Sequence, residues 1–143
     1  MQTSVVEFPG VSDDMLARAR SVCLALPETV EVATPPGSEF KIRRRTFAYV
    51  FAVEDPAGRV IPMLACRADP EEREALLAMG HPFFAPRSSV GRIGVVLEDT
   101  TDWTELAELI TDSYRLLAPQ KLAALVETPP PAPSAGFELP SGA

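Results

Sequence analysis

The sequence holds little of several residue types that mark particular classes of protein. Its 143 residues include two cysteines, one histidine and one tryptophan, and no apolar run reaches the roughly 18 to 20 residues needed to cross a bilayer. The cysteines, Cys23 and Cys66, lie far apart in the chain without a histidine motif, which fits neither a disulfide framework nor a zinc site. We therefore expect reduced thiols, no metal and no membrane partner.

Signals for secretion and for nucleotide binding are also missing. Residues 1–10 have no basic start and no hydrophobic core, so the expected location is the cytoplasm. The glycines at positions 91 and 94 do not have the spacing that a Walker or dinucleotide-binding loop requires. Nucleotide hydrolysis and hydride transfer are therefore not indicated, and no cofactor is expected.

What is present is the composition of an ordinary globular domain. The chain has 46% hydrophobic and 23% charged residues, and its length fits one domain, which we assign to residues 1–127. Residues 128–143 contain five prolines and almost no charge. Such a segment buries too little apolar surface to order itself, so it is predicted to be a disordered tail.

The charges are unevenly distributed along the chain. The net charge is −7, yet residues 40–97 carry nine basic and six acidic side chains, whereas both ends are acidic. An acidic molecule repels phosphate as a whole, so only a local group of cations could bind nucleic acid.

Three main helices are predicted from capping residues and from apolar positions at helical spacing. Each begins with a side chain able to cap a helix N-terminus, namely Ser12, Asp69 and Asp102. The helices are expected over residues 12–26, 69–80 and 102–117, with one or two more turns over 121–126.

Alternating apolar residues predict strands at 40–43, 46–53, 60–66 and 93–97, the second and third joined as a hairpin by the turn at 55–58. The segment 28–39 contains Pro35, Pro36 and Gly37 and is expected to be a loop, as is the segment that begins with Phe83 and Phe84. The predicted fold class is α+β, with an antiparallel sheet of wing-like hairpins flanked by N-terminal, middle and C-terminal helices.

The candidate binding residues are cations that follow the predicted strands. Four of them surround the turn after the first strand, and two more lie further along: Lys41, Arg43, Arg44, Arg45, Arg59 and Arg92. Cations on a hairpin suit contacts to the phosphates of a nucleic acid, and six such contacts would give a log-log salt slope of about −5. The alternative is that these are solvated turn and edge charges, which discourage aggregation between strands.

Catalytic readings are less well supported. His81 could act as a general base toward Cys66 or Ser88, but neither residue lies in a nucleophile motif, and burial would raise the pKa of Cys66. The acidic residues of the last long helix, which include Asp102, Glu105, Glu108 and Asp112, have the spacing of an ordinary solvated helix face. We therefore expect a protein that is not an enzyme.

Several short segments in a fixed order resemble one known family. They are Ala25–Glu28, Phe40–Ile42 followed by Thr46–Ala48, Ala68–Glu72, Asp102–Ile110 and Ser113–Leu122. In their order these segments are similar to the MmcQ/YjbR family of small bacterial proteins, over about residues 12–126. Two positions depart from that pattern: Pro35–Glu39 stands where the family usually has a Trp and a Pro, and Val95 or Val96 stands where an aromatic residue is common.

The resemblance implies an α+β fold with two β-wings between helices. Its likeness to the double-wing domain of transcription factors is why family members are labelled as DNA-binding, although fold alone does not set function. No catalytic residue is carried over. The leading hypothesis is therefore a non-catalytic module that binds double-stranded DNA or takes part in transcription. The alternative is a module that binds a protein or a small ligand at the apolar surface of Phe83, Phe84 and the loop Pro86–Gly91.

Overall fold

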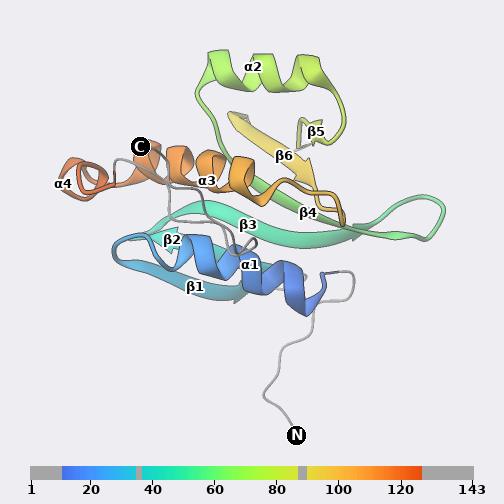
Figure 1. Ribbon diagram of the computed structural model, residues 1–143, viewed down its shortest axis with the longest axis horizontal. Helices are drawn as coiled ribbons and strands as arrows, with labels where there is room; N and C mark the ends of the chain where they lie inside the picture. Colours follow the sequence, from blue (N-terminus) through green and yellow to red (C-terminus); the bar gives the residue numbers. More distant parts are fainter. Residues whose placement is uncertain (1–10, 35–36, 87–89, 127–143) are drawn as a thin grey trace, which may run out of the picture.

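The computed structural model describes residues 11–34, 37–86 and 90–126, which form one antiparallel sheet and four helices (Figure 1). The sheet has six strands in the order β1-β2-β3-β4-β6-β5. The strands are β1 (Thr29–Thr34), β2 (Gly37–Ile42), β3 (Arg45–Glu54), β4 (Val60–Arg67), β5 (Phe83–Phe84) and β6 (Arg92–Val96). The predicted α+β class is confirmed. The predicted tail at 128–143 and residues 87–89 of the Pro86–Gly91 loop lie outside the described residues.

The helices are α1 (Asp13–Cys23), α2 (Pro70–Met79), α3 (Trp103–Leu117) and α4 (Gln120–Ala123). The side chain of Ser12 accepts a hydrogen bond from the backbone N–H of Met15, and that of Asp102 accepts from Thr104 and Glu105. Both predicted caps are therefore confirmed. The side chain of Asp69 makes no capping bond, so α2 begins on Pro70 alone. α1 ends before the predicted position because the chain turns after Cys23.

Two predicted loops are strands instead. The segment 28–39 contains β1 and the first half of β2, because Val30 and Val32 alternate with polar residues. Pro35 and Pro36 lie outside the described residues. Gly37 lets the start of β2 lie close to β3, because a Cβ at this position would lie 1.9 Å from the carbonyl oxygen of Val50. Phe83 and Phe84 form β5, which pairs with β6 through Val95 and Gly94.

The helices cover one face of the sheet. α3 packs against β3 and β4 and α1 against β3 and α3 (Figure 1), and Leu76 of α2 joins the same hydrophobic core. The largest fully buried side chains of that core are those of Tyr114, Phe40 and Phe47. Among the described residues, no helix is both long and apolar enough to cross a membrane.

A β-bulge in β3 ties the sheet to α3. The register jumps from Phe40 opposite Ala48 to Lys41 opposite Thr46, which leaves Phe47 without a partner in β2. The ring of Phe47 packs edge-on against Tyr114 with centroids 5.3 Å apart. Its carbonyl accepts a 2.6 Å hydrogen bond from the hydroxyl of Ser113, and this hydroxyl in turn accepts one of 2.9 Å from the backbone N–H of Arg67. One buried serine thus joins the start of β3 to the end of β4.

Candidate phosphate-binding site

Arginines from several elements gather at one end of the sheet. Because neighbouring strands are antiparallel, the turn between β2 and β3, the end of β4 and the start of β6 all lie at this end, next to the last residues of α3. A hollow of about 340 Å³ is lined there by Arg45, Thr46, Arg67, Arg92 and Leu117. A second hollow, of about 550 Å³, adjoins it through Arg45 and Leu117 and is also lined by Arg43, Arg44, Ala118 and Pro119. We call the five arginines of these hollows the arginine end: Arg43, Arg44, Arg45, Arg67 and Arg92.

Three of the six predicted binding residues are held in ion pairs. The Nη2 of Arg43 lies 3.0 Å from the Oε1 of Glu28. The Nζ of Lys41 lies 3.7 Å from the Oε1 of Glu39. Arg59 pairs with Asp55 across its own turn at 3.4 Å. These are exposed or half-exposed pairs, which add little stability but do cancel charge.

The remaining arginines of this end keep their charge unpaired. Within the described part of the chain, Arg44, Arg45, Arg67 and Arg92 form no ion pair. Arg67 donates one hydrogen bond to the carbonyl of Val90, at 3.1 Å. Arg67 and Arg92 also lie directly opposite each other on β4 and β6, an arrangement of like charges that destabilises a sheet. An anion between these side chains would remove that repulsion.

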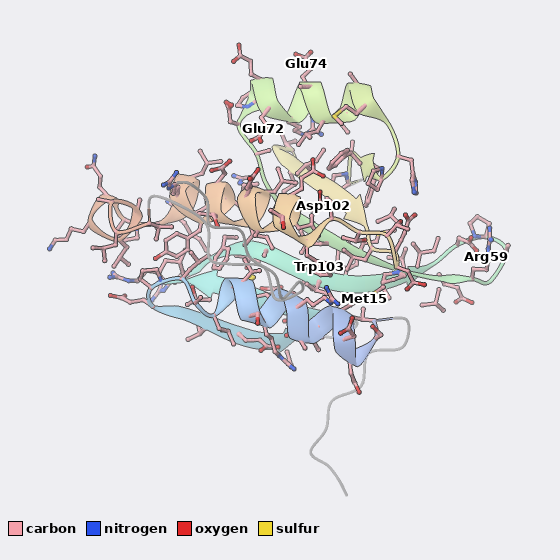
Figure 2. The ribbon with its side chains drawn as sticks, viewed as in Figure 1. Met15, Arg59, Glu72, Glu74, Asp102 and Trp103 are labelled. Carbon is pink, nitrogen blue, oxygen red and sulfur yellow. The ribbon has the colours of Figure 1, made fainter. Side chains whose placement is uncertain are left out.

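The structure divides the residues predicted from the sequence. Arg43, Arg44, Arg45 and Arg92 come together, whereas Arg59 lies at the tip of the β3–β4 hairpin, at the far end of the sheet (Figure 2). Sequence reasoning missed Arg67. The hairpin prediction could have indicated it, because pairing β3 with β4 brings the end of β4 next to the start of β3, where Arg45 lies.

Acidic side chains lie on the helices beside this end. Burial raises the pKa of Glu72 on α2, as do the nearby carboxylates of Asp112 and Asp69. Asp112 in turn lies 4.0 Å from Arg115. These carboxylates face the helix-covered side of the sheet, where Cys66 lies. They limit the strength of any anion binding, and so does Glu39 on the other face of the sheet, whose carboxylate accepts a 2.9 Å hydrogen bond from the hydroxyl of Thr46 beside the first hollow.

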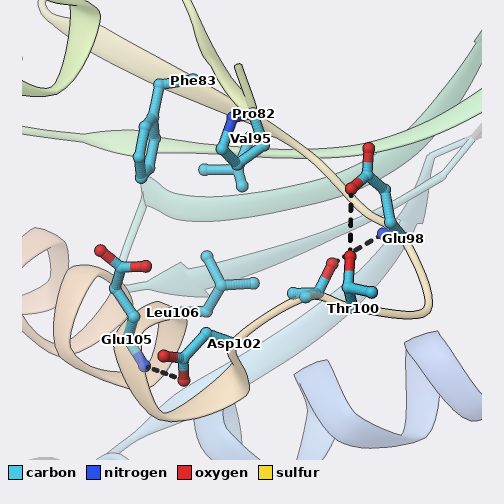
Figure 3. A pocket seen from close by; sticks show the side chains of 9 residues that line it. Pro82, Phe83, Val95, Glu98, Thr100, Asp102, Glu105 and Leu106 are labelled. Carbon is cyan, nitrogen blue, oxygen red and sulfur yellow. Dashed lines mark hydrogen bonds between the residues drawn. The ribbon is translucent and has the colours of Figure 1, made fainter. Parts of the chain in front are cut away.

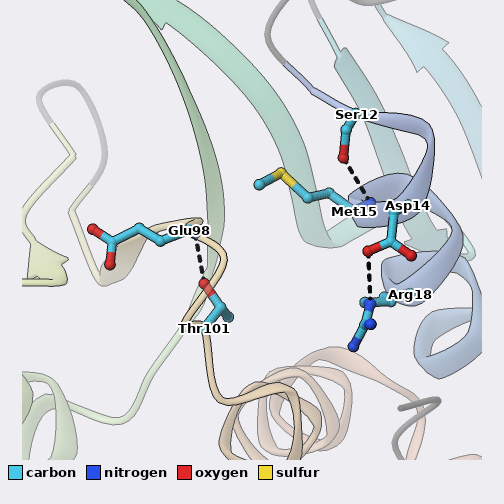
Figure 4. A network of polar contacts seen from close by, with 6 residues as sticks. All are labelled: Ser12, Asp14, Met15, Arg18, Glu98 and Thr101. Carbon is cyan, nitrogen blue, oxygen red and sulfur yellow. Dashed lines mark hydrogen bonds and ion pairs between the residues drawn. The ribbon is translucent and has the colours of Figure 1, made fainter.

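The apolar alternative also has a hollow, of about 200 Å³, beside Phe83 (Figure 3). Its polar lining serves the local fold. The carboxylate of Asp102 caps α3, and Glu98 pairs with His81 at 2.6 Å. A smaller hollow lies between the start of α1 and the loop before α3, and the bonds drawn around it stay within each segment: Arg18 to Asp14 in α1, and the N–H of Glu98 to the hydroxyl of Thr101 in the loop (Figure 4).

The side chains considered for catalysis are not arranged for it. Burial raises the pKa of Cys66 to about 12, so its thiol is protonated at neutral pH, and burial also raises that of Cys23 well above the usual value. His81 is exposed, and its Nε2 lies 2.6 Å from the Oε2 of Glu98; Ser88 lies outside the described residues. In the described residues, no group of three or more His, Cys, Asp or Glu side chains could hold a metal ion.

Fold and site together define a small two-layer α+β protein with a cationic end on its sheet. The chain belongs to the YjbR family, whose family model, described as YjbR, matches residues 24–116. This match confirms the family resemblance noted in the sequence, over a shorter range than the predicted 12–126. No curated protein matches the chain. YjbR is not a known enzyme family, and the match assigns no reaction and no ligand.

Proposed function

We propose that this protein is a non-catalytic nucleic-acid-binding module that contacts phosphates through the arginine end. The observation that carries the proposal is the set of four arginines around two joined hollows that form no ion pair with any described residue, among them the opposed pair Arg67 and Arg92. Guanidinium groups bind phosphate oxygens with two parallel hydrogen bonds, which makes arginine the residue best suited to this contact.

The charge of the whole molecule sets the expected strength of binding. A net charge of −7 opposes the approach of DNA, so binding depends on the local field of the arginine end and falls steeply with salt. Four phosphate contacts give a log-log salt slope of about −3.6, smaller in size than the slope of about −5 expected for all six sequence-predicted residues.

The test is fluorescence anisotropy with labelled duplex DNA over a series of salt concentrations. The variant R45A/R92A removes two cations whose side chains make no hydrogen bond within the described residues, so it should fold normally and reduce the slope to about −1.8. The control R18A/R59A removes the same charge from α1 and from the far hairpin tip, and it should leave the slope near −3.6. Undetectable binding at low salt, or equal loss in both variants, would show the proposal to be wrong.

A further inference from the structure

The second face of the sheet carries no helix among the described residues, and its side chains follow from the strand register. Residues directly opposite each other on paired strands point to the same face. On β3 and β4 these pairs are Tyr49 with Ala65, Phe51 with Met63 and Val53 with Ile61. Arg67 with Arg92, and Ala65 with Gly94, extend the same face to β6. We call this surface the open face.

Aromatic residues divide between the core and the open face. Five of the described aromatic side chains are buried, namely Phe40, Phe47, Phe83, Trp103 and Tyr114. Three others, Tyr49, Phe51 and Phe84, are only half buried. Tyr49 and Phe51 lie on the open face by register, and Phe84 covers Gly94, where an added Cβ would lie 2.3 Å from its ring. Packing in the hydrophobic core therefore does not explain why these three positions are aromatic.

The aromatic residues adjoin the unpaired arginines. Along β4, Ala65 lies opposite Tyr49, and Arg67 follows two residues later on the same face. Two residues of a strand span roughly 7 Å, so the backbone positions of the arginine and of the aromatic pair are near each other. Tyr49 and Phe51 stack on each other with centroids 4.5 Å apart and planes 15° apart, and both side chains are half buried. Small residues, Ala65 and Gly94, lie between this pair and the ring of Phe84.

We infer that the ligand of the arginine end is a single-stranded nucleic acid, whose phosphates lie on Arg67 and Arg92 and whose bases stack on the aromatic residues of the open face. This inference rests on the proposed function and narrows its ligand. Single strands suit the surface because their bases are free to stack, whereas the bases of a duplex face one another. A positively charged track beside aromatic rings is the usual basis of strand binding without sequence preference.

Charge favours this occupant over a second copy of the chain. Arg67 and Arg92 form no ion pair among the described residues. Glu39 lies on the same face, opposite Tyr49, and is held 3.7 Å from Lys41, so a second copy of the chain would have to break that pair to neutralise the two arginines. A strand of nucleic acid instead supplies one negative charge for each nucleotide. The experiments below also test whether the protein self-associates through this face.

The first experiment uses the unaltered protein and three probes of equal phosphate number. These are a fluorescent oligo-dT, an abasic oligomer with the same sugar-phosphate backbone, and a duplex. Stacking of one base adds about tenfold to affinity, so oligo-dT should bind at least tenfold more tightly than the abasic oligomer at one salt concentration. It should also bind more tightly than the duplex.

A second experiment changes the rings while keeping the apolar volume. Y49L/F51L removes both ring faces and should lower oligo-dT affinity by about tenfold or more, with affinity for the abasic oligomer unchanged. Tyr49→Phe keeps the ring and should bind oligo-dT as the parent protein does. Circular dichroism checks that each variant is folded, and the probe comparison above does not depend on any variant.

The outcomes separate this inference from the proposed function. If no probe binds in a salt-dependent way, both are wrong. If all three probes bind equally, phosphate binding stands and the inference of a single strand is overturned. A dimer at micromolar concentration that dissociates in Y49L/F51L would also overturn it, because the open face would then bind a second copy.

Discussion

Replacing Ser113 by Ala should destabilise the protein and loosen the arginine end. The hydroxyl of this buried residue donates to the carbonyl of Phe47 and accepts from the N–H of Arg67. Each buried polar group left without a partner costs about 1–3 kcal/mol. With two groups losing their partner, we expect a total loss of about 2–4 kcal/mol in the free energy of unfolding.

Thr111 of the same helix supplies the matched control. Its hydroxyl is also buried and donates to the carbonyl of Ala107 at 2.7 Å. That carbonyl already accepts the helical hydrogen bond of residue 111, so Thr111→Val leaves it satisfied. The expected loss is below about 1 kcal/mol.

Urea denaturation followed by circular dichroism measures both variants under the same conditions. A loss of 2–4 kcal/mol is a large part of the roughly 5–15 kcal/mol that stabilises a domain, and it should lower Tm by roughly 10 °C. If Ser113→Ala costs no more than Thr111→Val, the serine does not join β3 to β4 as described.

Three further results are expected. Burial raises the pKa of Glu31, but hydrogen bonds from Arg20 and Ser38 and the charge of Arg20 lower it more, so the net shift is downward. The ionised Glu31 therefore contributes its full stability above its unfolded-state pKa, and this contribution is lost as the pH falls through its folded-state pKa. In urea titrations, the stability of Glu31→Gln should depend less on pH below about pH 5 than that of the parent protein. Iodoacetamide at pH 8 should leave Cys66 unmodified in the native protein and label it in denaturant, because a pKa of about 12 keeps only about one thiol in 10,000 ionised. Rapid labelling of the native protein would instead support a catalytic role for this thiol. Gly94→Ala should cost about 1–3 kcal/mol because the new Cβ meets the ring of Phe84, and this cost should largely disappear in a Phe84→Ala background; an equal cost in both backgrounds would contradict the contact.

Local signals predicted the helices well. The caps at Ser12 and Asp102 are short-range patterns, readable from adjacent residues, and both are formed. The strand at 29–34 was missed because Pro35, Pro36 and Gly37 indicated a loop, although Gly37 begins β2 and allows its close approach to β3. Phe83 and Phe84 were missed because a strand of two residues has no periodicity to detect.

The candidate site could be predicted only in part, because it depends on register. The run of cations at 43–45 is visible in the sequence, and the turn between β2 and β3 keeps it together. That Arg67 and Arg92 lie opposite each other follows from the pairing of β4 with β6, which are far apart in the chain. Arg59 was grouped with these residues by composition alone, and the length of β3 separates it from them.

The most direct test of phosphate binding is an NMR titration of the protein with oligo-dT, in which the arginine Nε–H and backbone signals are followed residue by residue. We expect the largest shifts at Arg45, Arg67 and Arg92, with the signals of Arg59 unchanged. Shifts centred on the far hairpin tip, or no shifts at low salt, would contradict the assignment of a phosphate site to the arginine end.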